Sequence, residues 1–146
     1  HLFLFLLLLR FSLIMVLTFL AAITEEIIAH CGTLKGMAVV IIEEVITSEE
    51  FRLANENYPN YIKVVVDIDR RILAAGGEWH ADAEVVLLEN GSKQVDLWGG
   101  GVDLITKEIE FTSLINTRPG VSNSQEVLDL AIRSKMEEII RRLFDL

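Results

Sequence analysis

Apolar runs along the middle of the chain predict a β-sheet. Residues 38–46 are rich in β-branched side chains, as expected for a strand. Residues 61–68 show the clearest strand pattern, and residues 72–75 form a shorter apolar run after a turn at Asp69-Arg70. This turn lacks the glycine that the tightest hairpins prefer, so its position is predicted but its type is not.

Residues 76–84 carry the most informative pattern of the sequence. After Gly76-Gly77, an ionisable side chain occupies every second position, and the positions between are apolar or small. Because side chains alternate between the two faces of a strand, a strand here would place four ionisable groups on one face. These four groups are Glu78, His80, Asp82 and Glu84.

A hairpin is predicted to extend that polar face. Residues 85–88 are apolar at every position, which favours a central strand, and the turn signal at residues 89–93 leads into a strand over 93–98. If the loop has an odd length, directly opposite residues share a face, and Gln94 and Asp96 join the four ionisable groups. An even-length loop breaks this pattern.

Two helices are indicated by their caps. Thr47 and Glu50 fit a capping box, which predicts a short helix that ends near Asn55. Asp129 can cap a longer C-terminal helix, because apolar side chains recur after it at helical spacing. They are Ile132, Met136, Ile139, Ile140 and Leu143.

The region between the hairpin and the last helix has weaker signals. Residues 99–101 are three glycines and are expected to be flexible, and residues 102–107 are expected to form a connection. Residues 108–116 are expected to form another alternating strand, followed by a loop over residues 121–128. The elements together predict an α+β domain. Its antiparallel sheet of about five strands packs against the C-terminal helix, and a short N-terminal helix completes it.

The first 23 residues form an apolar run that is long enough to span a bilayer. Three interpretations stay open: a transmembrane anchor, a secretory signal, and non-coding sequence read through upstream of a start at Met37. Ala21-Ala22 is only a partial match to a signal-peptide cleavage site. We favour a read-through or dispensable extension over residues 1–36, with an anchor second, followed by a single domain over residues 37–146.

The net charge of −9 argues against a nucleic-acid-binding surface, because neutralising phosphates requires clustered basic residues. The single cysteine, Cys31, excludes an internal disulfide framework and a cysteine-based zinc site in the domain. A cytoplasmic location is expected, and a membrane-anchored location through residues 1–23 is the alternative.

The polar stripe has two interpretations. Side chains two residues apart on a strand face lie about 6–7 Å apart, so Glu78, His80 and Asp82 could share a divalent metal ion or act in acid-base catalysis. The alternative is a solvated sheet face. Arg118 suits a carboxylate or phosphate through its planar fork, and an ordinary salt bridge is its structural alternative. The stripe's Glu84, together with Gln94, Asp96 and Asn116, completes the set of candidate ligand-binding residues.

Three segments of the chain resemble a known family. They are GGEWHADAE at residues 76–84, GSKQVDLWG at 91–99, and SLINTRP at 113–119, followed by the Asp-capped C-terminal helix. The sequence resembles the uncharacterised prokaryotic family called domain of unknown function 5674 over about residues 37–146. It departs from that family after Gly99, where a more polar loop is expected. The resemblance implies a domain-sized unit and no activity.

Two hypotheses about function follow. The first is a small soluble binding or regulatory module of unknown ligand that can self-associate. The second is a metal-dependent hydrolase-like enzyme in which Glu78, His80 and Asp82 act as ligands or base and Arg118 stabilises negative charge. The two differ in whether the domain carries a bound metal.

Overall fold

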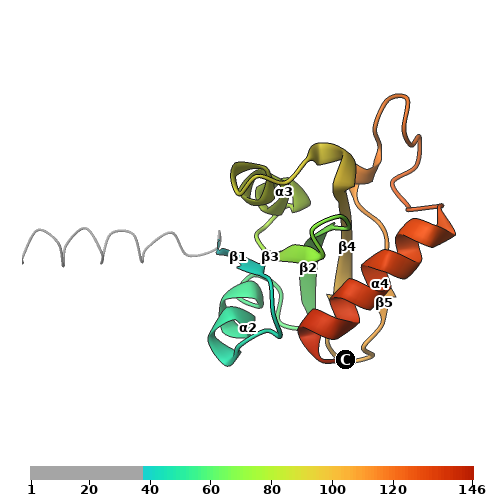
Figure 1. The fold of residues 1–146 in the computed structure, drawn as a ribbon. Helices are drawn as coiled ribbons and strands as arrows, with labels where there is room; N and C mark the ends of the chain where they lie inside the picture. Colours follow the sequence, from blue (N-terminus) through green and yellow to red (C-terminus); the bar gives the residue numbers. More distant parts are fainter. Residues whose placement is uncertain (1–37) are drawn as a thin grey trace, which may run out of the picture. The chain divides into compact units, whose positions relative to one another are not determined.

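The structure is a computed structural model that describes residues 38–146, and these residues form a five-stranded antiparallel sheet with helices on both faces (Figure 1). The strand order is β1-β3-β2-β4-β5. The strands are β1 (Val39–Ile42), β2 (Tyr61–Asp67), β3 (Ile72–Gly76), β4 (Leu97–Asp103) and β5 (Ile109–Glu110). The helices are α2 (Ser48–Ala54), α3 (His80–Glu89) and α4 (Leu130–Phe144), with short 3-10 helices η1 (Gln94–Asp96) and η2 (Leu114–Asn116).

The predicted α+β class, with its five-stranded antiparallel sheet and C-terminal helix, is confirmed. The predictions of an extension, signal or anchor over residues 1–36 lie outside the described residues. Within residues 38–146, no helix is both long and apolar enough to cross a membrane.

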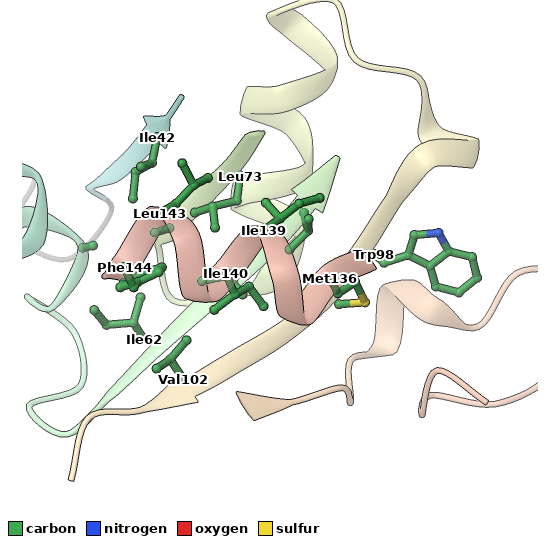
Figure 2. Packing of buried hydrophobic residues seen from close by; sticks show 14 of the residues in the cluster. Ile42, Ile62, Leu73, Trp98, Val102, Met136, Ile139, Ile140, Leu143 and Phe144 are labelled. Atoms are coloured by element: carbon green, nitrogen blue, oxygen red, sulfur yellow. The ribbon is translucent and has the colours of Figure 1, made fainter. Parts of the chain in front are cut away.

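Two apolar layers lie on opposite faces of the sheet. Val64 and Val66 of β2 belong to the larger cluster, which α4 covers with Met136, Ile139, Ile140 and Leu143 (Figure 2). Val65 points to the other face and packs with the buried side of α3. Residues 64–66 are therefore apolar without alternation because both faces of β2 are covered.

The helix caps fold as their residues predict. The backbone N–H of Glu50 donates to Thr47 Oγ1 at 3.2 Å, and the Glu50 carboxylate accepts from the Thr47 backbone N–H at 2.7 Å, which completes the capping box of α2. Asp129 accepts from the backbone N–H of Ala131 at 2.8 Å at the start of α4. These bonds satisfy backbone N–H groups that have no partner inside the helix.

The strand predicted over residues 78–88 is wrong, because the chain forms helix α3 there. Gly76 and Gly77 adopt positive φ values of 98° and 80°, which end β3 and turn the chain away from the sheet. Since no strand follows, the polar stripe on one strand face and the hairpin register that added Gln94 and Asp96 to it are wrong as well. Residues 94–96 form η1 and not a strand.

The flexible segment predicted at residues 99–101 is also wrong, because these glycines lie inside β4, paired with β2. Glycine is needed at these positions because neighbouring atoms leave no room for a Cβ atom. A Cβ atom at Gly101 would lie 1.8 Å from Tyr61 Oη, and one at Gly99 would lie 2.5 Å from Ser113 Cβ. The Tyr61 side chain crosses β4 over Gly101 and donates to the Glu110 carboxylate at 3.0 Å. The predicted strand over 108–116 is correspondingly short, since only Ile109 and Glu110 pair as β5 before η2 begins.

Candidate functional site

Asp82, one of the predicted site residues, lies in the first turn of α3. The chain leaves β3 through Gly76-Gly77, and the Asp82 carboxylate accepts from the backbone N–H of Trp79 at 2.8 Å. A Cβ atom at Gly77 would lie 3.1 Å from Asp82 Cβ, so glycine leaves room for this cap. Asp82 therefore has a structural role at the helix start, where an acidic side chain is also favoured by the helix dipole.

His80 is the first residue of α3 and is half-buried against β4. Its Nε2 lies 2.7 Å from the carbonyl oxygen of Gly100. Because a carbonyl can only accept, Nε2 carries the proton and Nδ1 is left as an acceptor in the neutral ring. Burial lowers the pKa of His80 below its ordinary value, the Gly100 carbonyl opposes this, and the positive charge of Lys63 lowers the pKa further.

Glu84 lies one helical turn after His80 and meets a residue from η1. Gln94 Nε2 donates to Glu84 Oε1 at 3.3 Å. The carbonyl of Gln94 in turn accepts from Arg118 Nη1 at 2.6 Å. Residues from three separate segments of the chain are thus linked, although the strand pairing that predicted the proximity of Glu84 and Gln94 does not exist.

Arg118 is held by backbone carbonyls. Besides Gln94, its Nε donates to Ile115 O at 3.1 Å and its Nη2 donates to Leu97 O. The guanidinium carbon lies 4.5 Å from the centre of the Trp98 ring, which is a cation-π contact. Burial lowers the pKa of Arg118, and the nearby Glu84 carboxylate partly offsets this.

Asn116 joins the segment that carries Arg118 to the sheet. It is fully buried, its Oδ1 accepts from the Gly99 N–H at 2.8 Å, and its Nδ2 donates to Gly99 O at 3.0 Å. Nδ2 also donates to Gln125 O at 2.9 Å. The side chain thereby pairs with the edge of β4 as a neighbouring strand would, which gives Asn116 a structural role.

Glu84, Gln94 and Arg118 line one open cavity of about 430 Å³. We call it the Arg118 cavity. Its walls combine these three polar side chains with Thr117 and four apolar residues: Val95, Ile115, Pro119 and Val121. A carboxylate, an amide and a guanidinium therefore face the same aliphatic-walled space.

The other predicted site residues lie elsewhere. Glu78 is exposed in the turn before α3, where its backbone carbonyl accepts from Lys63 Nζ. Asp96 is half-buried in η1, and its backbone carbonyl accepts from the Ile68 N–H at 3.0 Å. Across residues 38–146, no group of three His, Cys, Asp or Glu side chains is arranged to hold a metal ion. The stripe of Glu78, His80 and Asp82 is thus spread along a helix start.

Trp98 is the residue whose part in the site the sequence pattern did not reveal. Its indole is 5% exposed, stacks on Arg118 and lines a second cavity beside α4. The sequence signal was present in the adjacent glycines, since Gly99 lets the η2 segment close over β4 next to the indole.

The three segments named in the sequence resemblance meet here, at β4 and its neighbours. The sequence model of a family described as a protein of unknown function, DUF5674, matches residues 40–143, so the chain belongs to this family. No curated protein and no solved structure matches the chain.

Proposed function

We propose that this chain, a member of a family of unknown function, is a binding module that holds a small zwitterionic ligand, such as an aliphatic amino acid, in the Arg118 cavity. The proposal rests on one observation above all. Glu84 and Arg118, of opposite charge and from distant segments, line the same cavity without forming an ion pair with each other in the described part of the chain.

The Arg118 guanidinium supports recognition of a carboxylate. Nη1 and Nη2 each carry two N–H bonds, and each has one carbonyl acceptor, so one N–H of each nitrogen is left for a ligand. Partial burial strengthens a charge-assisted hydrogen bond, since less water screens it. The three backbone contacts fix the guanidinium before a ligand arrives, which reduces the entropy cost of binding.

The Glu84 carboxylate supports recognition of the ammonium group of the same ligand. Gln94 donates to one carboxylate oxygen of Glu84 and leaves the second without a hydrogen-bond partner among the described residues. In the same cavity, Val95, Ile115 and Val121 offer apolar surface to the aliphatic part of the ligand. Such a mixture of aliphatic walls and a few fixed polar groups is typical of small-molecule sites.

Calorimetric titration of the full chain tests this function. L-valine carries both charged groups, whereas isovalerate carries only the carboxylate and isobutylamine only the ammonium. We expect valine to bind more tightly than either, and Glu84→Gln to weaken valine while leaving isovalerate unchanged. Glu56→Gln is the matched control, since Glu56 is exposed and lies outside the cavity. Failure of valine to bind at millimolar concentration would refute the proposal.

A further inference from the structure

A second cavity, of about 710 Å³, lies beside the first and shares one wall with it. We call it the Trp98 cavity, and the residues that matter here are Trp98, Val121, Ser124, Leu128, Asp129 and Ile132. Val121 lines both cavities. Arg118 lines the first, and Trp98, on which the guanidinium stacks, lines the second. A ligand held at Arg118 is therefore next to the Trp98 cavity.

The Trp98 indole contains an unused hydrogen-bond donor. Its Nε1 is buried and has no acceptor in the described part of the chain. Figure 2 shows the indole pointing away from the other labelled side chains of the apolar cluster. Because indole N–H can only donate, a group that satisfies it must be an acceptor. A buried polar group without a partner is uncommon enough to need an explanation.

The walls of the Trp98 cavity indicate what kind of group fits. Val121, Leu128 and Ile132 supply apolar surface, and Leu128 is 68% exposed at its rim. Asp129 also lines this cavity, and the negative charge of its carboxylate, which caps α4, repels an anion. The occupant should therefore have an aliphatic stem and an acceptor without negative charge.

We infer that the Trp98 cavity is a specificity subsite that receives the ligand's side chain and selects an aliphatic stem ending in a neutral carbonyl, as in glutamine. This inference rests on the proposed function, because the Arg118 cavity holds the main chain of the same ligand. Leucine fills the apolar walls and leaves Nε1 unpaired. Glutamate offers an acceptor but brings a charge towards Asp129.

Tryptophan fluorescence of the full chain carrying Trp79→Phe tests the inference. The sequence has two tryptophans, so Trp98 is the one that remains in this variant. Alanine, leucine, glutamine and glutamate are titrated in turn. We expect glutamine to bind about fivefold more tightly than leucine, as one net hydrogen bond would give, and to shift the Trp98 emission more than alanine does.

Asp129→Asn supplies the second arm of the test. Asparagine is as good an N-cap as aspartate, so α4 should stay intact while the charge is removed. We expect this variant to bind glutamate as well as it binds glutamine. If all four amino acids bind equally and Glu84→Gln still weakens them, the subsite is refuted and the proposed function stands. If none of them binds, the proposed function itself fails.

Discussion

Removing the Asn116 side chain should be one of the costliest substitutions of a polar residue in this domain. In Asn116→Ala, the Gly99 N–H and Gly99 O lose the side chain that pairs with them in a fully buried position, whereas Gln125 O keeps the Ser113 N–H as a donor. At about 1 kcal/mol for each of the two orphaned groups, the low end of the usual range, the free energy of unfolding should fall by about 2 kcal/mol. The segment that carries Arg118 should loosen at the same time.

Urea unfolding followed by circular dichroism measures this loss. With an m-value of about 1–3 kcal/mol per M, the midpoint should fall by at least about 0.7 M. The matched control is Thr117→Ala, because Thr117 is exposed and next to Asn116, and it should change stability by less than about 0.5 kcal/mol.

A second variant separates lost hydrogen bonds from lost volume. Asn116→Asp keeps the size but places a carboxylate against Gly99 O and Gln125 O, so its pKa should rise above the ordinary value of about 3.9. The variant should therefore be least stable near neutral pH and approach the wild type on acidification towards pH 4. A loss below about 1 kcal/mol for Asn116→Ala, or a pH-independent deficit for Asn116→Asp, would refute the reasoning.

Three further predictions concern the rest of the fold. Because burial keeps the pKa of His80 below its unfolded value of about 6.5, the unfolded state binds more protons below that pH, and stability should fall on acidification; urea unfolding of His80→Gln should show a smaller fall. Gly101→Ala should lower the free energy of unfolding by about 1–3 kcal/mol in the wild type and by almost nothing in a Tyr61→Ala background. Equal losses in the two backgrounds would contradict the steric account. Met136→Ala should lower the free energy of unfolding by about 2–5 kcal/mol in the same assay. Leu130 is 77% exposed, so Leu130→Ala should change that free energy little, and similar values for the two variants would contradict the core assignment.

The elements with local signals could be predicted from the sequence. The capping box of Thr47 and Glu50 and the Asp129 cap each depend on residues a few positions apart, so they are readable without tertiary information. Strand β2 was equally clear because its β-branched run is covered on both faces. These elements confirmed the fold class.

Helix α3 was missed for a specific reason. Its N-cap residue is Trp79, which is not a usual capping residue, and the alternation from Glu78 to Glu84 mimics the period of a strand. Two features of the sequence favoured a helix instead of a strand. They are Asp82 at the third helical position and the two glycines that end β3. Apolar residues on both sides of α3 further hid its amphipathic pattern, since Val85 is 51% exposed whereas Leu87 is buried.

Strand β4 could not be predicted because its cause is distant in sequence. Three successive glycines normally indicate flexibility, but here Tyr61 and Ser113 occupy the space that side chains would need. The site shows the same limit. The sequence named three polar residues of the Arg118 cavity, Glu84, Gln94 and Arg118. The contacts that join them are tertiary, and the strand register proposed to bring Glu84 and Gln94 together was wrong.

Mapping a bound ligand by NMR tests the central claim most directly. Amide ¹H–¹⁵N correlation spectra of the full chain would be recorded during titration with L-valine. The account predicts that the largest shifts belong to Glu84, Gln94 and residues 115–121. Little change is expected at residues 43–50, which follow the edge strand β1 and line neither cavity. Shifts that concentrate outside the Arg118 cavity, or no shifts at millimolar valine, would contradict it.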